Sequence, residues 1–345
     1  MIYSIKNYRK LLKPISIIIC LALAAIPVGA MAKKSDYLRP ELKVPANNRI
    51  TPERVALGKA LFFDPRLSGS NWISCATCHN PAMGWSDGLP TAIGHNMTVL
   101  GRATPTILNS AYNRKQMWDG RFRSLEQQAL GPMQADLEMN QDMDELLVEL
   151  KAIPGYVAMF KAAYGNEGIT LDTVAKAIAT FERTAISTEA PFDRYIKGDR
   201  KAISVSAKRG FKLFEGKAKC TACHQGYNFV DDGFHNIGLP ESNDPGRYKI
   251  VKVAVLKGAF KTPTLRDVAL TAPYMHNGVF KTLDEVVEHY NEGGKGANID
   301  PNLKPLHLSA QEKKDLVAFM ETLTGEHHDI TIPALPPSSF NISRR

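Results

Sequence analysis

Two short cysteine motifs constrain this chain more than any other feature. They read CATCH at residues 75–79 and CTACH at residues 220–224, and both have the spacing C-x-x-C-H. This spacing is the attachment signature for c-type haem: each cysteine forms a thioether with a haem vinyl group, and the histidine that follows is placed to bind the iron. A chain with two such motifs must fold around two large, flat cofactors.

The cysteine count favours haem over the other uses of such pairs. The chain has five cysteines, and Cys20 falls in the N-terminal leader described below. The other four are Cys75, Cys78, Cys220 and Cys223. A thioredoxin-like dithiol, a structural zinc site or disulfides in an oxidising compartment are the alternatives. Because the two motifs use every cysteine beyond the leader, we predict two covalent haem c groups, with His79 and His224 as proximal iron ligands.

The N-terminus has the pattern of an export signal. An apolar run over residues 15–28 is followed by small residues and preceded by the basic residues Lys6, Arg9, Lys10 and Lys13. An uncleaved membrane anchor is the alternative, but the run is shorter than the roughly 20 apolar residues that a membrane span requires. We therefore predict a signal peptide over residues 1–32, cleaved near Ala30 or Ala32, and a mature protein in the periplasm.

Composition and charge indicate a globular protein. The chain has 345 residues, of which 44% are hydrophobic and 23% charged, and this length suffices for two domains with their own cores. Four of its formal +8 charges lie in the leader, so +4 remains beyond it. The propionates of two haems would offset most of that charge. Nucleic-acid binding therefore gets no support from charge.

An internal repeat divides the chain beyond the leader into two related halves. Residues 58–79 resemble residues 209–224, and each stretch leads into a haem motif. Residues 104–122 match residues 262–280 with a constant offset of 158. This offset sets Trp118 opposite His276, Gln128 opposite Val286, and Pro132 opposite Tyr290. We predict haem domains over residues 33–195 and 196–330, and a tail over residues 331–345 that is either a strap or disordered.

Helical periodicity dominates both halves. Apolar residues recur at helical spacing around residues 146–160, 174–181 and 316–323. The last of these segments begins with a capping box, Ser309 and Glu312, and ends at Gly325. Strand signals are scarce, and KIVKVAVL at residues 249–256 is the strongest. We predict a mostly α fold of two cytochrome c-like domains, with long loops around the cofactors and little β structure.

Beyond the haem motifs, the chain resembles the bacterial di-haem cytochrome c peroxidase and MauG family over essentially its whole mature length. The stretches that carry the resemblance are CATCHNPAMGWSDG, TPTILNSAYN, MWDGR, GPMQADLEMN, CTACH and TPTLRDVALTAPYMHNG. The resemblance implies a peroxidatic haem in the N-terminal domain and an electron-donating haem in the C-terminal domain. It also implies that Trp118, in MWDGR, lies between the two haems and relays electrons or holes.

The resemblance further implies an open, reactive side of the first haem. Glu138 matches the family's catalytic acid, and a carboxyl there can take the first proton of peroxide and return it to the leaving oxygen. Gln128 matches an amide that orients peroxide, and Pro132 cannot bind iron. His95 lies on a loop that in many members supplies a sixth ligand to the resting first haem and leaves when the second haem is reduced.

The distal ligand of the second haem is where this sequence departs from the better-known peroxidases. Those proteins have a methionine at the position of Tyr290, whereas MauG has a tyrosine, whose phenolate favours ferric iron. The rivals are Met275, His289, which would point aside on a helix, and an open site. The repeat places Tyr290 opposite Pro132, on the distal side, so we favour Tyr290. The resemblance places His276 at the haem edge, near the propionates.

The resemblance also implies a calcium ion between the domains, held by one asparagine side chain and by carbonyls that match Thr271 and Pro273. The asparagine position is Ala103 in this chain. Calcium prefers six to eight oxygen ligands, so the loss of one weakens the expected site. Calcium binding is therefore an open prediction.

Three functions fit these features. The first is an exported peroxidase that reduces hydrogen peroxide to water with electrons from a small cytochrome c or cupredoxin, passed from the second haem to the first. The second is a MauG-like enzyme that uses peroxide to oxidise Trp or Tyr residues of a partner protein. The third is a non-catalytic electron carrier, which Glu138, Gln128 and Pro132 argue against. Family frequency favours the peroxidase by analogy, and a homodimer is compatible with all three.

Overall fold

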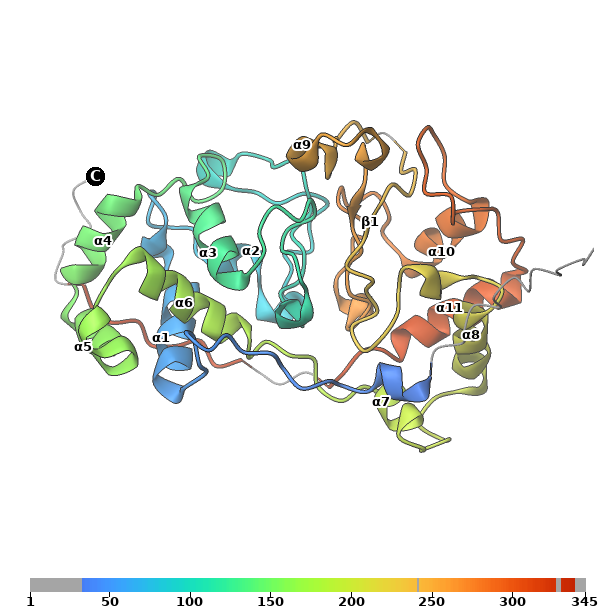
Figure 1. Cartoon of the computed structure of the whole chain (residues 1–345), viewed down its shortest axis with the longest axis horizontal. Coiled ribbons are helices and arrows are strands. Elements are labelled where there is room, and N and C mark those ends of the chain that lie inside the picture. The colour runs from blue at the N-terminus through green and yellow to red at the C-terminus, as the bar shows by residue number, and fades with distance from the viewer. Residues whose placement is uncertain (1–32, 241, 327–329, 339–345) are drawn as a thin grey trace, which may run out of the picture. The chain divides into compact units, whose positions relative to one another are not determined.

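The computed structural model describes residues 33–240, 242–326 and 330–338 of the 345-residue chain. The predicted signal peptide lies outside the described residues. The fold is mostly helical, as predicted, with long loops between short helices (Figure 1). No helix within these three ranges combines the length and apolar character of a membrane span.

The described helices and strands follow one another along both halves. The helices are α1 (Pro52–Phe63), α2 (Cys75–Cys78), α3 (Leu125–Gln134), α4 (Met143–Lys151), α5 (Pro154–Tyr164), α6 (Leu171–Glu182), α7 (Pro191–Ile196), α8 (Val205–Glu215), α9 (Tyr248–Val251), α10 (Leu283–Glu292) and α11 (Ala310–Glu321). Two short antiparallel strands, β1 (Phe234–His235) and β2 (Phe260–Lys261), form the sheet.

Two hydrophobic cores hold the described residues together. The first is built mainly by α1, α5 and α6 and includes Phe62 and Phe181. The second is built mainly by α7, α8 and α11 and includes Phe211 and Phe319. Along the sequence, the change from the first core to the second falls between residues 185 and 192.

The ends of the described chain cross to the opposite core. Tyr37, in the 3-10 helix η1 (Lys34–Tyr37), is buried in the second core, where its ring packs edge-on against Phe192. Near the other end, Leu335 packs against the first core, and Arg66 donates a hydrogen bond to the carbonyl of Pro336 at 3.0 Å. Residues 330–338 therefore strap the C-terminal end of the chain to the N-terminal core.

Each core contains a close helix crossing at a glycine. At Gly58 of α1, a Cβ would lie 1.9 Å from the carbonyl oxygen of Ala177 in α6. At Gly210 of α8, a Cβ would lie 1.8 Å from the carbonyl oxygen of Asp315 in α11. Only a residue without a Cβ allows the backbones to approach so closely. Because a haem motif follows α1 and α8 in sequence, the two crossings tie both motifs to their cores.

The offset of 158 relates the two halves in space as well as in sequence. It converts the bounds of α3 into those of α10, residue for residue. The isolated bridge between Gln116 and Phe122, just before α3, recurs between Tyr274 and Phe280, just before α10. The same turn and helix are therefore built twice.

Two details of the predicted secondary structure are wrong. Residues 249–256 form no strand: α9 is followed by the 3-10 helix η8 (Ala254–Leu256), with Lys252 in the left-handed region between them. Alternating β-branched residues favour a strand where one face is buried, whereas residues 249–255 are all exposed. The last helix ends at Glu321 and not at Gly325.

Candidate functional site

Both haem motifs open onto one cavity of about 1170 Å³ within the described residues. The first motif lies on α2 and the residue after it, and the second on the 3-10 helix η7 (Cys220–Ala222) and the two residues after it. The predicted residues that also line the cavity are Trp118, Gln128, Pro132, Glu138, Thr271, Pro273, Met275, His276 and Tyr290. The structure thus gathers most of the predicted site around one space.

The two proximal histidines have the same local arrangement. His79 Nδ1 lies 3.2 Å from the carbonyl oxygen of Trp85, and His224 Nδ1 lies 2.9 Å from that of Phe229. A carbonyl can only accept, so each Nδ1 carries the proton and each Nε2 keeps a free lone pair. Burial lowers the pKa of His79, and it lowers that of His224 to about 4. Both rings are neutral at physiological pH, as iron ligands must be.

The four cysteines also fit the prediction of two haem groups. They are free thiols that line the cavity in two pairs. Burial raises the pKa of Cys75 to about 12, that of Cys78 to about 11 and that of Cys220 to about 12. Free thiols in an apolar cavity, each pair beside an unprotonated imidazole nitrogen, fit two covalently attached haems.

The side of the first pocket that we predict to be open is lined by residues of α3 and of the loop after it. Gln128 and Pro132 lie on α3, and the Gln128 amide contacts the sulfur of Met117 at 3.9 Å. Glu138 lies on the loop, and its Oε1 is 3.9 Å from Nη2 of Arg121. Burial raises the pKa of Glu138, and the positive charge of Arg121 opposes that shift. A carboxyl with a raised pKa that lines the same cavity as an amide and a proline can exchange protons there.

Trp118 links the two halves of the cavity. Its indole Nε1 donates to the carbonyl of Ala103 at 2.9 Å, and the amide of Ala103 donates to the carbonyl of His276 at 2.7 Å. The Trp118 and His276 rings also meet edge-on, with centroids 6.4 Å apart. On its other side, the Trp118 carbonyl accepts from the amide of Lys261 at 2.8 Å. This aromatic side chain is thus held against both domains.

The three candidate distal ligands of the second haem differ in how they lie relative to the cavity. Tyr290 lines the cavity, and burial, followed by the nearby thiols of Cys220 and Cys223, raises the pKa of its hydroxyl. Met275 lines the cavity as well. His289 is buried and turned away, because its Nε2 meets the carbonyl oxygen of Ile237 at 2.9 Å. The geometry therefore favours Tyr290 and Met275 over His289.

His276 is fixed in place by its neighbours. Its ring stacks on Phe260 with centroids 3.6 Å apart, and its Nε2 lies 3.0 Å from the hydroxyl of Ser242. Burial lowers the pKa of His276 to about 4, so the ring is neutral and its Nε2 is available for polar contact. Placement at the edge of the second haem stays a prediction.

His95 lies outside the residues that line the cavity. Its Nε2 is 3.3 Å from the amide nitrogen of Asn140, and its backbone amide meets the carbonyls of Leu137 and Glu138. The ring is therefore held beside the loop that carries Glu138. Ligation of the first iron by His95 stays a prediction.

The calcium prediction gains no ligand at Ala103. The methyl side chain offers no oxygen, and the Ala103 carbonyl already accepts from Trp118. Thr271 and Pro273 line the cavity, as the prediction requires. Calcium binding stays a prediction, with fewer protein oxygens than the family pattern provides.

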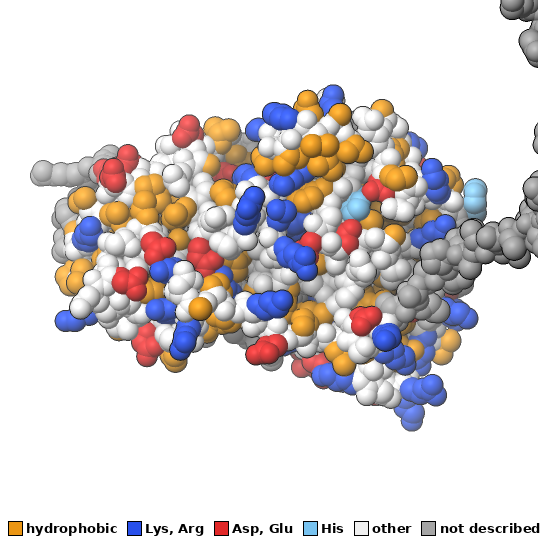
Figure 2. All heavy atoms as spheres, in the orientation of Figure 1, with side chains coloured by type: hydrophobic (Ala, Val, Ile, Leu, Met, Phe, Trp, Pro, Cys, Tyr) orange, Lys and Arg blue, Asp and Glu red, His pale blue; other side chains and the backbone are white. Residues whose placement is uncertain are grey.

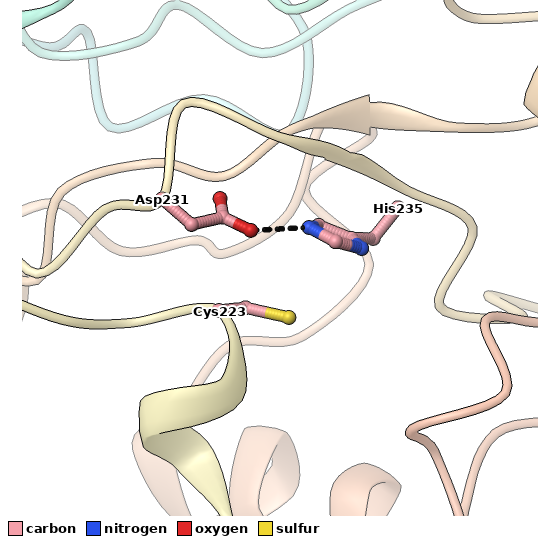
Figure 3. Close-up of side chains that lie close together, drawn as sticks. All are labelled: Cys223, Asp231 and His235. Atoms are coloured by element: carbon pink, nitrogen blue, oxygen red, sulfur yellow. Dashed lines mark hydrogen bonds and ion pairs between the residues drawn. The ribbon is translucent and has the colours of Figure 1, made fainter. Parts of the chain in front are cut away.

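The sequence did not predict that two carboxylates hold the ring of His235. Its Nε2 meets Asp231 at 2.7 Å and its Nδ1 meets Asp300 at 2.6 Å, and Figure 3 shows the sulfur of Cys223 beside the ring. Cys223, Asp231 and His235 bring possible metal ligands within 4.8 Å of one another. However, both ring nitrogens are already bound to carboxylates, and Cys223 belongs to a haem motif. The cluster is therefore part of the wall of the second pocket.

A buried carboxyl group also lines the first pocket. Glu182, at the end of α6, lines the cavity, and its Oε2 has no hydrogen-bond partner among the described residues. Burial raises the pKa of Glu182 to about 8. No sequence signal marked this residue, because it sits at a position of the α6 pattern that otherwise holds core residues.

Known proteins match this chain over most of its length. The family model described as di-haem cytochrome c peroxidase matches residues 52–201, and the one described as cytochrome c matches residues 207–324. Methylamine utilization protein MauG of Methylorubrum extorquens is 52% identical and covers 88% of each chain. Cytochrome-c peroxidase IdrP1 of Denitromonas iodatirespirans is 41% identical and covers 90% of this chain and 93% of its own.

A solved structure matches as well. The crystal structure of a MauG-like protein associated with microbial copper homeostasis has a TM-score of 0.78 and 31% identity, and the match covers 84% of this chain and 94% of that one. Two cytochrome c-type domains with one haem motif each define a di-haem c-type protein. The chain belongs to the di-haem cytochrome c peroxidase and MauG family, which confirms the predicted family and fold class. Because its relatives carry both names, the choice of reaction rests on the residues around the second motif.

Proposed function

We propose that this chain is a MauG-like di-haem enzyme of the periplasm, which uses hydrogen peroxide to oxidise aromatic side chains of a partner protein. The observation that carries this function is Tyr290, which lines the second half of the cavity at the position where the first half has Pro132. A tyrosine ligand favours ferric iron and lowers its potential. When bound, the two haems supply the redox chemistry and store oxidising equivalents.

The residues of the first pocket perform the proton chemistry. Glu138 takes the first proton from peroxide and returns it to the departing oxygen. Gln128 orients the peroxide through its amide, and Pro132 leaves room for it because proline has no ligand atom. Trp118, held against both domains, connects the pockets through its indole ring.

Identity to the relatives also supports the MauG-like reaction. Two proteins named MauG are 52% and 43% identical to this chain, whereas the proteins named cytochrome c peroxidase are 34% to 41% identical. The peroxidase is the second candidate, with a small cytochrome c or cupredoxin as electron source. Family frequency favours this second candidate by analogy. A sixth ligand from His95 would also favour it, but His95 lies outside the residues that line the cavity.

Spectroscopy of the holoenzyme tests the role of Tyr290. EPR and optical spectra of wild type, Tyr290→Phe and Tyr290→Met would be compared, with Tyr195→Phe as a control on α7. We expect both Tyr290 variants, and not the control, to change the ferric spectrum of the second haem. We also expect one equivalent of peroxide, without reductant, to alter the spectra of both haems in the wild type and only that of the first in Tyr290→Phe.

Two results would contradict the MauG-like function. An unchanged ferric spectrum of the second haem in Tyr290→Phe would exclude the tyrosine ligand. Wild-type spectra that respond to peroxide at the first haem alone, together with rapid turnover in the presence of a small redox protein, would favour the peroxidase instead.

A further inference from the structure

One buried carboxylate joins two arginines directly after Trp118. Asp119 is 2% exposed, and its Oδ2 accepts from Nη1 of Arg102 at 2.7 Å and from Nη1 of Arg121 at 3.0 Å. Its Oδ1 accepts from the backbone amide of Arg121 at 3.2 Å. Asp119 does not contact Glu138 itself, but it binds the arginine that faces Glu138.

Arg121 is shared unequally between two carboxylates. Its Nη1 donates to Asp119 at 3.0 Å, whereas its Nη2 lies 3.9 Å from Oε1 of Glu138. Because N–H···O hydrogen bonds are about 2.7–3.2 Å long, only the contact with Asp119 is a hydrogen bond. The guanidinium is therefore bound to Asp119 and acts on Glu138 through its charge alone.

Asp119 is itself held in place from the second half of the chain. Arg102, which shares Oδ2 of Asp119, binds Asp244 through Nε at 2.6 Å and through Nη2 at 2.9 Å. A shift of Asp119 would break several charge-assisted hydrogen bonds at once, and these are the strong ones in proteins. Arg121 therefore has a firmly held partner on one side and a loop residue, Glu138, on the other.

The groups around Glu138 leave Arg121 as the charge that matters most. Among the described residues, the other titratable groups near it are Cys78 at the end of α2, His95, and Asp136 on the same loop. The residues of α3 that line the cavity are uncharged. Burial raises the pKa of Glu138, and the charge of Arg121 opposes that shift.

Close charges act more strongly on Glu138 than the surface does. Figure 2 shows Lys and Arg side chains beside Asp and Glu side chains across one face of the molecule, where water and salt screen them. The side chains of Asp119 and Arg102 are only 3% and 20% exposed, so their charges are screened less. The position of Arg121 thus depends on its partner Asp119 and not on the general surface charge.

We propose that Asp119 is a positioning residue that restrains Arg121 and so keeps it from closing onto Glu138. A guanidinium in full contact with Glu138 would stabilise the carboxylate and make it a weaker base toward peroxide. Held at a distance, the same charge stabilises the carboxylate only in part, so the group can both take a proton and return it. This inference rests on Glu138 as the acid–base group of the proposed function, and it does not depend on the ligand of the second haem.

The pH profile of the peroxide reaction tests this role. Stopped-flow absorbance of the holoenzyme gives the rate constant at each pH, and an isotope-edited infrared titration without peroxide follows the carboxyl band that Glu138→Gln removes. The variants are Asp119→Asn, Arg121→Gln and the two combined. The matched control is Asp315→Asn, which removes another buried carboxylate bound by an arginine, Arg209, away from the cavity.

The two single variants should move the midpoint of both titrations in opposite directions. In Asp119→Asn, Arg121 is free to contact Glu138, so the midpoint should fall by about one pH unit and the rate above it should drop. In Arg121→Gln, the carboxyl loses its nearby positive charge, so the midpoint should rise by about one pH unit. The combined variant should match Arg121→Gln, because Asp119 acts through Arg121. The control should keep the wild-type midpoint.

Three results would overturn the restraint. A midpoint that rises in Asp119→Asn would show that Asp119 holds Arg121 toward Glu138 and not away from it. Shifts that simply add in the combined variant would show that Asp119 acts through its own charge. A shift in Asp315→Asn as large as that in Asp119→Asn would assign the effect to the general loss of a buried carboxylate.

A second variant covers the case in which Asp119→Asn does not fold. Arg102→Gln removes the competitor for Asp119, so Arg121 should be drawn further from Glu138 and the midpoint should rise. An unchanged midpoint in Arg102→Gln would also overturn the proposal. Because the infrared titration uses no peroxide, its result is separate from the MauG-like reaction, which fails on its own if Tyr290→Phe leaves the ferric spectrum of the second haem unchanged.

Discussion

The two haem pockets repeat one turn and one helix and carry different side chains on them. α3 and α10 have equivalent bounds, and the turns before them hold Met117 and Met275 at φ values of 71° and 75°. On this shared frame, the first pocket presents Gln128 and the second Val286 at the equivalent position. The first pocket therefore has an amide at this position, and the second has an apolar residue. Function in the two halves depends on side chains placed on a duplicated backbone.

The comparison extends to the helices behind the pockets. Phe181 of α6 and Phe319 of α11 lie at equivalent glycine crossings, and the next residues, Glu182 and Met320, both line the cavity. The first pocket thus has a buried carboxyl where the second has a thioether. At this position, therefore, only the first pocket has a group that can exchange a proton.

Removing the acid of the first pocket should have the largest effect. Glu138→Gln keeps the side-chain shape but cannot take a proton, so the rate constant for reaction with peroxide should fall by about 10²- to 10⁴-fold. In the wild type, this rate should fall as the pH drops through the pKa of Glu138, which burial raises, because the protonated acid cannot act as a base. Stopped-flow absorbance measures both effects.

Glu41→Gln removes an exposed carboxylate of the N-terminal segment and serves as the control for Glu138→Gln. A Glu138→Gln enzyme that keeps the wild-type rate would show that another group moves the proton. The division of roles between the two pockets would then need a different acid.

Replacing Glu182 with methionine, the residue found at the equivalent position 320, should change how the free energy of unfolding depends on pH. Burial raises the pKa of Glu182 from 4.5 to about 8, so between these values the folded state binds more protons than the unfolded state. Wild-type stability should therefore fall as the pH rises across this window, by at most about 5 kcal/mol. Glu182→Met should remove most of that slope, measured by denaturant unfolding of the holoprotein at several pH values.

A slope that persists in Glu182→Met would assign the pH dependence to other groups. Glu182→Gln serves as the second variant, since it keeps the polarity of the side chain and cannot ionise. If both variants unfold at low denaturant concentration at every pH, the carboxyl contributes to packing and does not report on ionisation.

Copying the second pocket into the first should close its open face. Pro132→Tyr places a phenol where Tyr290 lies in the repeat, and we expect the reaction with peroxide to slow by roughly two orders of magnitude because the site loses its free volume. The optical spectrum of the first haem should move toward that of the second. An unchanged reaction rate would show that the repeat does not align the two distal sides.

The haem motifs and the repeat could be predicted from the sequence because they depend on local or periodic spacing. The haem motifs, the capping box at Ser309 and the offset of 158 depend on spacing along the chain, and the structure has each of them. Which residues are buried could not be predicted from spacing alone. Residues 249–256 alternate like a strand, yet they lie in α9 and η8 with residues 249–255 exposed. Exposure depends on what the rest of the chain covers.

Contacts between distant residues also escaped the sequence. His235 is held by Asp231, four residues away, and by Asp300, which no spacing rule connects to it. The hydrogen bond of His289 to Ile237, which turns that ring away from the second pocket, also joins residues far apart in the sequence. Such contacts depend on how loops pack, and a single sequence holds no periodic trace of them.

The glycine crossings should respond alike if the two cores are true counterparts. Gly58→Ala and Gly210→Ala each place a Cβ closer than 2 Å to a backbone oxygen, so we expect each to destabilise the protein by about 1–3 kcal/mol or more. Gly101→Ala is the control, because a Cβ there would meet no atom within 4 Å. Chemical denaturation measures all three. A loss at only one crossing would show that the cores differ in how they accommodate strain.

Calcium should have the smallest effect, because the contact between the two halves at Ala103 is made by backbone groups. The Ala103 amide donates to His276 and the carbonyl accepts from Trp118, so the junction holds without an ion. Treatment of the wild type with EGTA should change the peroxide reaction by less than about twofold. Ala103→Asn adds one oxygen ligand beside Thr271 and Pro273, and we expect calcium to bind this variant roughly tenfold more tightly by isothermal titration calorimetry. Loss of the wild-type reaction in EGTA, restored by calcium, would show that backbone carbonyls and water hold the ion without the asparagine.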